Sequence, residues 1–322
     1  MSHARIAIVL IVGCFSVIRA HAQRGACQER TFPVSLVTKD ASTAPELSTT
    51  NLEGTYRNQP VHVKLVTLEQ NAPRIILLMD TSGSMTEKLN QSLDIAEDLL
   101  SSMPPAVDVG LAFFAKDLQP VARPTSDRQK LKYQLEGLRR NLSSYRGKTA
   151  LWTAVLESVK MLGDARLGDS IYVISDGGDN LSSSAKEPVA IALTRAGIRM
   201  FAAAFPAGGQ LLPSPEETVG RNDLQQVSED TGGAGFIFSG MYLGHFPSSQ
   251  RPNVRDKSGQ RTQFGLRLDE QIRQLVSFYR VNVELPETVD RPHEWKLALA
   301  GLSKSQRDNL VLMYPHLLAP CN

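Results

Sequence analysis

The chain lacks an excess of charge of either sign. Its 322 residues include 35 Lys and Arg against 33 Asp and Glu. Two of the basic residues, Arg5 and Arg19, lie in the first 22 residues, which hold no acid, so the rest of the chain carries no net charge. Because nucleic-acid-binding proteins need a clustered basic surplus to meet phosphates, this balance argues against a nucleic-acid partner. A hydrophobic content of 42% argues against wholesale disorder.

The chain also lacks an apolar run long enough to cross a membrane. The apolar run from Ile6 to Ile18 follows Arg5 and is shorter than the about 20 residues that a span needs. It is followed by Ala20-His21-Ala22, which has the small-x-small form of a cleavage site. We therefore expect residues 1–22 to be a signal peptide that is cleaved after Ala22.

A signal peptide predicts export to the periplasm, the cell surface or the medium. We expect no membrane span to be left after cleavage. A lipoprotein signal is the alternative, because Ile11 to Cys14 resembles a lipobox. The apolar run before Cys14 is very short and continues beyond it, which favours the cleaved signal.

Cysteine is scarce, with three residues in the whole chain. Cys14 would leave with the signal peptide, and Cys27 and Cys321 remain near the two ends of the mature chain. An even number of cysteines in an oxidising compartment favours a disulfide bond between them. Two unpaired thiols on frayed ends are the other possibility that the sequence leaves open.

Signatures of catalysis are lacking as well. The histidines of the mature chain are scattered without ligand spacing, and none is near the polar segments described below. The segment from Gly163 to Ser170 has the spacing of a P-loop, but Asp169 stands where the lysine is required and the segment precedes a strand. Without a general base, serine has no means of becoming a nucleophile, so we expect no enzyme. The four histidines are His62, His245, His293 and His316.

Buried strands and amphipathic helices alternate through the middle of the chain. Residues 75–79 are apolar on both faces, as in a buried parallel strand, and 88–102 has one apolar stripe, as in a helix. The pattern predicts a doubly wound α/β sheet with helices on both faces. The further strands are expected at 107–115, 118–123 (an edge strand), 170–175, 199–205 and 235–238, and the further helices at 127–139, 150–162, 188–196, 223–230 and 266–277.

Alternating strands flank this region on both sides. In 61–68, Val61, Val63 and Leu65 are expected on one face, and 31–37, 279–285 and 295–299 provide further strands. We expect these segments to pack together as a small antiparallel β module beside the α/β domain. The expected organisation is a signal peptide (1–22), an N-terminal β segment (23–72), the α/β domain (73–245), and a region with loop, helix and C-terminal β segment (246–322). Within the last, 246–264 is basic and reads as a solvated loop or, alternatively, a docking strip for an acidic partner.

Oxygen-bearing side chains follow the first buried strand, in the segment Asp80-Thr81-Ser82-Gly83-Ser84-Met85. The carboxyl edge of such a sheet is where open α/β folds bind ligands. Asp80, Ser82 and Ser84 are spaced i, i+2, i+4, and Gly83 allows a tight turn between them.

Two further polar residues are expected at the same edge. Thr149 starts a buried helix, and Asp176 ends the third parallel strand. With Asp80, Ser82 and Ser84 they make three hydroxyls and two carboxylates, which suits a small hard cation such as Mg²⁺. Taken singly, each is more typical of a helix cap; it is the combination that predicts a metal site.

The three-part pattern resembles the von Willebrand factor type A domain with its metal-ion-dependent adhesion site, over about residues 73–245. The matching motifs are Asp80 to Met85, Gly147-Lys148-Thr149-Ala150-Leu151, and Ser175-Asp176-Gly177-Gly178-Asp179-Asn180. The resemblance implies a mostly parallel sheet with one antiparallel edge strand. It implies that Ser82 and Ser84 bind the metal directly, and that Thr149, Asp80 and Asp176 bind it directly or through water. It also implies an open position for an Asp or Glu of a protein partner.

The segment Leu224 to Gly233 is similar to a segment of exported bacterial proteins that carry this domain. The expected function is therefore that of an exported, adhesion-type module that binds a protein through a divalent cation, with Mg²⁺ first and Mn²⁺ or Ca²⁺ as alternatives. The rival hypothesis is a structural or assembly subunit in which the metal only stabilises the loops.

Overall fold

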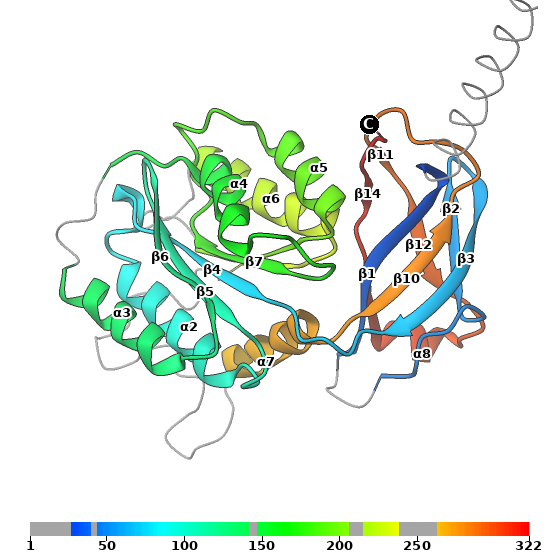
Figure 1. Ribbon diagram of the computed structural model, residues 1–322, viewed down its shortest axis with the longest axis horizontal. Coiled ribbons are helices and arrows are strands. Elements are labelled where there is room, and N and C mark those ends of the chain that lie inside the picture. The colour runs from blue at the N-terminus through cyan, green and yellow to red at the C-terminus, as the bar shows by residue number, and fades with distance from the viewer. Residues whose placement is uncertain (1–26, 40–43, 142–146, 206–214, 238–262, 322) are drawn as a thin grey trace, which may run out of the picture.

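The computed structural model describes residues 27–39, 44–141, 147–205, 215–237 and 263–321. Within these ranges the chain forms two six-stranded sheets and a two-stranded ladder. One six-stranded sheet is the centre of an α/β domain, and the other builds a β module beside it (Figure 1). The predicted signal peptide 1–22, the alternative lipidation site Cys14 and residues 246–262 of the basic segment lie outside the described residues.

The sheet of the α/β domain is parallel except at one edge. In spatial order the strands are β6 (Leu118–Thr125), β5 (Val109–Phe114), β4 (Ile75–Asp80), β7 (Ser170–Ser175), β8 (Arg199–Ala204) and β9 (Gly235–Ile237). β4 pairs in parallel with both β5 and β7, while β6 pairs with β5 in the antiparallel direction, as predicted for an edge strand. β4, β5, β7 and β8 are buried along their whole length, in keeping with apolar side chains on both faces.

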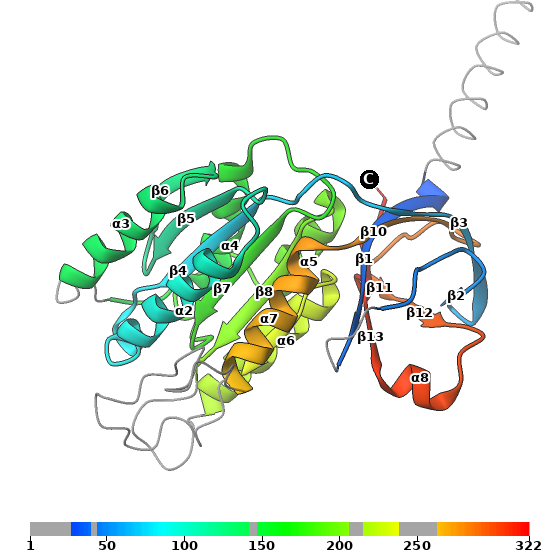
Figure 2. The ribbon, with the colours of Figure 1, turned by 90° about the horizontal axis from the view of Figure 1, so that it is seen from below.

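Helices cover both faces of this sheet, which confirms the doubly wound arrangement (Figures 1 and 2). Alternate residues of β4 enter two separate cores, because successive side chains of a strand point to opposite faces: Leu77 packs in one and Leu78 in the other. Among the described helices, none has the length and apolar character that a membrane span requires. One face carries α2 (Leu89–Ser102), α3 (Arg128–Arg140) and α7 (Gln263–Val276), and the other carries α4 (Leu151–Leu162), α5 (Lys186–Ala196) and α6 (Pro215–Asp230).

Both ends of the chain build the β module, as the sequence predicts. Its core contains Trp295, whose indole Nε1 donates a hydrogen bond to the carbonyl of Pro315 at 2.6 Å, and whose ring lies 5.0 Å from that of Phe32. Burial of these aromatic rings gives the module a core of its own. The spatial order is β12 (Lys296–Leu299), β2 (Leu52–Tyr56), β3 (Gln59–Leu68), β10 (Tyr279–Glu284), β1 (Glu29–Thr38) and β13 (Leu310–Met313), with α8 (Lys304–Asp308) before β13 and a ladder of β11 (His293–Glu294) with β14 (Leu317–Leu318).

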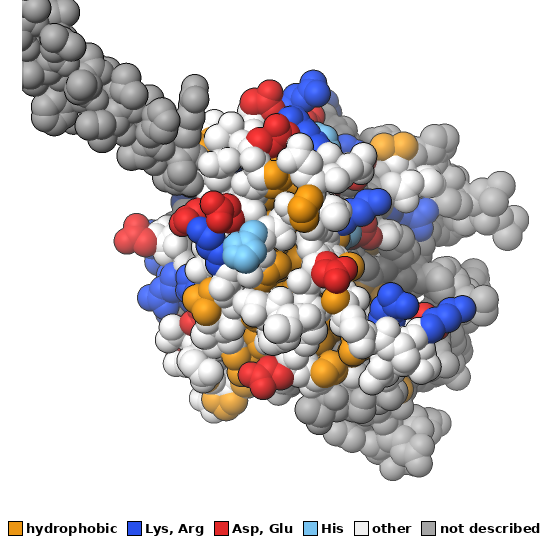
Figure 3. Space-filling view, turned by 90° about the vertical axis from the view of Figure 1, so that its right-hand side faces the viewer, with side chains coloured by type: hydrophobic (Ala, Val, Ile, Leu, Met, Phe, Trp, Pro, Cys, Tyr) orange, Lys and Arg blue, Asp and Glu red, His pale blue; other side chains and the backbone are white. Residues whose placement is uncertain are grey.

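One strand of the module departs from the predicted alternation. Val61 and Val63 are buried, but Leu65 is 48% exposed. The pairing of β3 with β10 shifts here: Val283 lies opposite Val63 and Asn282 opposite Leu65, so Lys64 is an extra residue in the ladder. An extra residue reverses the facing of every residue beyond it, which is why the expectation for Leu65 was wrong. Figure 3 views the module from its outer side, where hydrophobic side chains lie scattered between charged ones.

The α/β domain is an insertion within the β module. It lies in sequence between β3 and β10, which are neighbours in the module sheet. The two connections run side by side where they leave the module, since the backbone N–H of Glu69 donates to the carbonyl of Phe278 at 3.0 Å. Cys27, just before β1, and Cys321, near the C-terminus, form a disulfide bond. This bond confirms the predicted pairing and excludes two free thiols.

A buried arginine joins the module to the domain. Arg199, at the start of β8, is fully buried, and its guanidinium donates to Ser35 Oγ of β1 at 3.1 Å and to the carbonyls of Gln274 and Leu275 at the end of α7. It also lies over the ring of Phe278, with 4.8 Å between the guanidinium carbon and the ring centroid. Burial lowers the pKa of Arg199 to about 9, so the cation persists at neutral pH and holds the seam together.

Candidate metal centre

The five predicted site residues lie on three loops at the C-terminal edge of the parallel sheet. Asp80 is the last residue of β4, and Ser82 and Ser84 follow it around a short 3₁₀ turn, Gly83–Met85. Thr149 stands two residues before α4, and Asp176 directly follows β7. Because β4 and β7 are adjacent parallel strands, their ends meet at one edge.

The loop after β4 folds around the carboxylate of Asp80. The backbone N–H of Ser82 donates to Asp80 Oδ1 at 2.8 Å, which closes the turn, and the hydroxyl oxygens of Ser82 and Ser84 lie 3.2 Å apart. Ser82 is buried, whereas Ser84 is exposed. The pair of hydroxyls therefore spans from the interior to the solvent.

Hydrogen bonds tie the three loops to one another. The N–H of Gly83 donates to the carbonyl of Gly147 at 3.1 Å, which joins the first loop to the second. The N–H of Thr149 donates to Asn180 Oδ1 at 3.0 Å, and the N–H of Asn180 donates to the carbonyl of Thr149 at 3.1 Å, which joins the second loop to the third. The structure thus brings together the loops that carry all five residues.

A side chain from the third loop caps α4. The N-cap of α4, Ala150, has no side chain that can bond the first turn, and Asp179 Oδ1 instead accepts from the N–H of Leu151 at 3.2 Å. A carboxylate at a helix N-terminus satisfies an otherwise unpaired donor and interacts favourably with the helix dipole. Asp179 therefore fixes the start of α4, and with it Thr149, relative to β7.

The carboxylates of Asp80 and Asp176 are both buried, and the charge of Asp176 acts on Asp80. Asp80 is fully buried, and its Oδ2 accepts from Ser175 Oγ at 2.6 Å. Burial, together with the nearby charge of Asp176, raises the pKa of Asp80 to about 7. Asp176 Oδ1 accepts from the N–H of Gly178 at 3.2 Å, and its Oδ2 lies 3.0 Å from Lys88 Nζ.

This donor set fits a small hard cation. Two cis oxygen ligands of an octahedral Mg²⁺ with bonds of 2.0–2.1 Å lie about 2.9 Å apart. The 3.2 Å between the hydroxyl oxygens of Ser82 and Ser84 is close to that value. In the described part of the chain, no group of three or more His, Cys, Asp and Glu residues could hold a metal. The hydroxyl oxygens of Ser82 and Ser84 would supplement the carboxylates as ligands, and the turn that carries them is joined to Asp80 through the N–H of Ser82.

Two glycines allow the third loop to touch α6. Gly177 has φ of +85°, a backbone conformation that L side chains rarely adopt, and a Cβ there would lie 2.5 Å from the carbonyl carbon of Gly220. A Cβ on Gly220 would in turn lie 2.1 Å from the carbonyl oxygen of Gly177. This backbone contact positions the loop that begins with Asp176.

Sequence reasoning did not identify four residues of the site. Ser175, Asp179 and Asn180 lie in or beside the motif that includes Asp176, so their polarity was the available signal. Lys88 gave no comparable signal, because a lysine just before an amphipathic helix is ordinarily solvent-exposed. In the structure it is 5% exposed.

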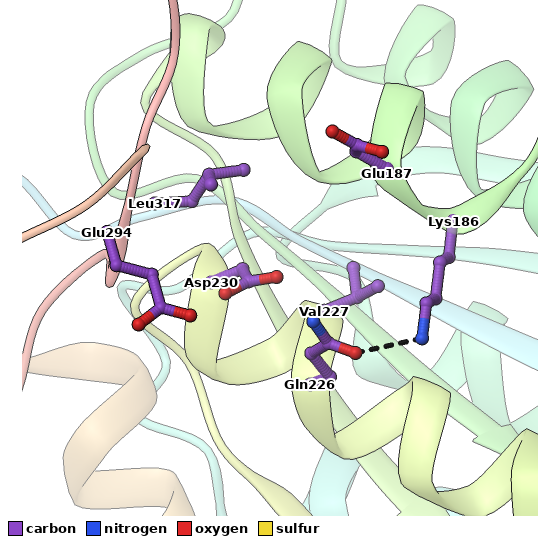
Figure 4. Close-up of a pocket in the computed structure, with 7 residues that line it drawn as sticks. All are labelled: Lys186, Glu187, Gln226, Val227, Asp230, Glu294 and Leu317. Atoms are coloured by element: carbon purple, nitrogen blue, oxygen red, sulfur yellow. Dashed lines mark hydrogen bonds between the residues drawn. The ribbon is translucent and has the colours of Figure 1, made fainter. Parts of the chain in front are cut away.

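A pocket of about 190 Å³ lies elsewhere, between α5, α6 and the β module (Figure 4). Lys186 and Asp230 line it from the α/β domain, and Glu294 and Leu317 from the module. Lys186 belongs to the first turn of α5 and Asp230 is the last residue of α6, so this pocket is separate from the three loops of the candidate metal centre.

One segment of the chain matches the model of a known protein family. Residues 75–178 match the family model of the von Willebrand factor type A domain. No curated protein matches the chain.

Solved structures that match the chain include an aerotolerance-related membrane protein from Bacteroides fragilis, which is 19% identical, with a TM-score of 0.42 over 52% of this chain and 92% of that chain. BatB from Bacteroides thetaiotaomicron is 18% identical, with a TM-score of 0.43 over 52% of this chain and 92% of that chain. A von Willebrand factor type A protein from Catenulispora acidiphila is 11% identical, with a TM-score of 0.43 over 85% of this chain and 71% of that chain.

Proposed function

We propose that this protein is an exported module that binds another protein through a divalent cation. The observation that carries the proposal is the pair of hydroxyl oxygens of Ser82 and Ser84, 3.2 Å apart and leading from the buried carboxylates to the surface. In this proposal Ser82 and Ser84 bind the cation directly, and Thr149, Asp80 and Asp176 bind it directly or through water. Mg²⁺ is the first choice, with Mn²⁺ and Ca²⁺ as alternatives.

The partner contributes a carboxylate from an Asp or Glu side chain. Hydroxyls are neutral ligands, so a cation held by Ser82 and Ser84 keeps much of its charge and attracts a further anion. The exposure of Ser84 supports an approach from the solvent on this side. Adhesion through a shared metal ion is therefore the mode of binding that we propose.

Binding, not catalysis, is the function that the side chains favour. The described histidines, His62, His293 and His316, all belong to the β module and none lies on the three loops of the metal centre. A serine nucleophile needs an adjacent base, and neither Ser82 nor Ser84 has a described histidine beside it. We propose that the protein is not an enzyme.

Export is proposed from the predicted signal peptide and is supported by the disulfide bond. Disulfide bonds persist in oxidising compartments such as the periplasm and the extracellular space. The bond between Cys27 and Cys321 fits such a location. N-terminal sequencing of exported protein should begin at Gln23, and a lipidated protein that begins at Cys14 would contradict cleavage after Ala22.

The test is a pull-down of partners from the native host with and without chelator. Partners should bind in Mg²⁺, be released by EDTA, and bind again when Mg²⁺ or Mn²⁺ is restored. Ser84→Ala should abolish binding, because the exposed hydroxyl is a direct ligand. Ser101→Ala is a matched control, since Ser101 is also an exposed serine but lies at the end of α2, where its hydroxyl donates to the carbonyl of Glu97.

The measurement that decides is partner affinity in EDTA at a temperature where circular dichroism shows a folded protein. Undiminished affinity there would contradict binding through the metal. It would favour the structural subunit, in which chelation lowers the melting temperature while assembly persists.

A further inference from the structure

Lys88 is a buried cation within the proposed metal centre. Its side chain is 6% exposed, that of Asp176 is 1% exposed, and Nζ lies 3.0 Å from Asp176 Oδ2. Lysine is almost never fully buried unless its ammonium group has a partner, because removing a charge from water is costly. The ion pair therefore accounts for the burial of Lys88.

The backbone turn that presents the metal-ligating hydroxyls also positions Lys88. The N–H of Met85 donates to the carbonyl of Ser82, and the N–H of Lys88 donates to the carbonyl of Met85 at 2.9 Å. The carbonyl of Lys88 accepts from the N–H of Ser92 in the first turn of α2. Lys88 is thus held at a fixed place relative to Ser82 and Ser84.

The carboxylate that Lys88 contacts is one of the two proposed for the cation. The carboxylates of Asp80 and Asp176 are both buried, and each experiences the charge of the other. One ammonium group beside Asp176 offsets part of this negative charge from within the chain. A divalent cation that uses the same carboxylate must meet this resident positive charge.

We propose that Lys88 is a positioning residue that lowers the metal affinity of this centre, because its ammonium group competes with the divalent cation for the carboxylate of Asp176. This inference rests on the metal centre of the proposed function and adds its regulation. The ammonium group stabilises the loops when metal is scarce, and it makes cation binding weak enough to be reversible. The partner carboxylate then adds the negative charge that favours metal retention, so metal and partner bind cooperatively.

The experiment is a calorimetric titration of the full chain with MgCl₂ and with MnCl₂. Lys88→Met removes the charge and keeps the length of the side chain, and Lys88→Gln keeps a donor for Asp176 without the charge. Both variants should bind metal more tightly than the wild type, with Kd lowered at least about tenfold, because repulsion between the ammonium group and the cation disappears. Lys88→Arg retains the charge and should keep a Kd within about threefold of the wild type.

Arg74→Met is the matched control. Arg74 forms the other strongly buried ion pair of the described chain, with Asp169, but at the opposite edge of the sheet. Its loss should leave the Kd for metal unchanged. Circular dichroism identifies which variants are folded, and the two neutral replacements of Lys88 provide independent chances of a folded protein.

Three results would overturn the role of Lys88. The first is an unchanged or raised Kd in the folded neutral variants. The second is a decrease of Kd in Lys88→Arg that equals the decrease in Lys88→Met. The third is an absence of metal binding in wild type and variants alike. A merely structural lysine predicts the first of these, since its loss would disorder the loops and weaken metal binding.

The two proposals fail separately. If the wild type and variants bind metal with the expected ratio but partners bind equally well in EDTA, the proposed function is wrong and the role of Lys88 stands. If partner binding needs metal but the neutral variants show no gain in metal affinity, the proposed function stands and the role of Lys88 is wrong.

Discussion

At the N-terminal edge of the parallel sheet, the buried carboxylate of Asp169 accepts hydrogen bonds from the guanidinium and the backbone N–H of Arg74 and from the N–H of Arg166. The remaining guanidinium donors of Arg74 reach the carbonyls of Leu162 and Asp164. At the C-terminal edge, Asp176 accepts one bond from Lys88 and one from Gly178. Both edges bury an ion pair, but among the described residues the carboxylate of Asp176 accepts fewer hydrogen bonds than that of Asp169.

Under the proposed function, these similar ion pairs serve stability at one edge and binding at the other. A carboxylate surrounded by a fork of donors has no capacity for another ligand, so the pair of Arg74 and Asp169 fixes the fold. The carboxylate of Asp176 is held by one ammonium group and one backbone N–H, so a metal ion could take the place of the ammonium group. The following predictions test this comparison, beginning with the largest expected effect.

Breaking the ion pair at the N-terminal edge should destabilise the protein most. Arg74→Met leaves the carboxylate of Asp169 buried without its cation, which should lower the free energy of unfolding by about 3–5 kcal/mol. Urea denaturation measures the loss. A loss below about 1 kcal/mol would contradict the structural role of this edge.

Metal should stabilise the C-terminal edge and with it the folded protein. At a free Mg²⁺ concentration of one hundred times Kd, the free energy of unfolding should rise by about 2.7 kcal/mol, because the ion binds the folded state alone. The melting temperature in Mg²⁺ should exceed that in EDTA at equal ionic strength. Equal melting temperatures, together with no heat of metal binding, would remove the distinction between the two edges.

Loss of one hydroxyl should weaken metal binding without unfolding the protein. Ser82→Ala should raise the Kd for Mg²⁺ at least about tenfold, or about 1.4 kcal/mol. Ser170→Ala is the control from the other edge, where the buried hydroxyl donates to the carbonyl of Gly168 at 3.0 Å, and it should leave Kd unchanged. Equal effects of the two substitutions on Kd would show that the hydroxyls of the C-terminal edge have no special role.

Asp176→Ala would be a poor probe for the same purpose. It removes a proposed ligand, but it also leaves Lys88 buried without its carboxylate, and an unpaired buried charge destabilises the fold. Its effects on metal affinity and on folding would be difficult to separate, whereas Ser82→Ala changes only the first.

The smallest expected effect concerns Asp230, at the end of α6 in the pocket between domain and module. Burial and the charges of Glu294 and Glu229 together raise its pKa to about 6. A carboxyl group whose pKa is raised on folding lowers the free energy of unfolding as the pH rises from about 4 through 6. Asp230→Asn removes this effect, so it should stabilise the protein above pH 6 and not below pH 4. The gain should be below about 1 kcal/mol, because Asp230 is partly exposed. Melting temperatures of variant and wild type across this pH range should diverge, and parallel curves would contradict the expectation.

The sequence was sufficient to predict the elements that carry the site. The buried run of β4 and the polar residues after it locate Asp80, Ser82 and Ser84, and the ends of parallel strands must meet at one edge. Lys88 was beyond prediction, because its burial depends on Asp176, which is 88 residues away in the sequence. The exposure of Leu65 was also beyond prediction, because a bulge depends on the partner strand and not on local alternation.

Some boundaries also depended on tertiary packing. α6 begins at Pro215, eight residues before the predicted start, and proline is well tolerated in a first helical turn. Its apolar pattern is weak before Leu224, so local periodicity does not indicate the first two turns. The contact of Gly220 with Gly177 shows why a glycine is present within this helix.

The insertion of the α/β domain between β3 and β10 decides how mechanical force would travel through the protein. A pull on the two ends of the chain enters at Cys27 and Cys321, so the covalent bond between them carries the load and the α/β domain stays slack. A pull applied at the proposed metal centre would reach the module through the paired connections at Glu69 and Phe278, which load the neighbouring strands β3 and β10 at the same end. Because Arg199 bonds the α/β domain to β1, its hydrogen bonds would resist this pull before β3 separates from β10 one hydrogen bond at a time.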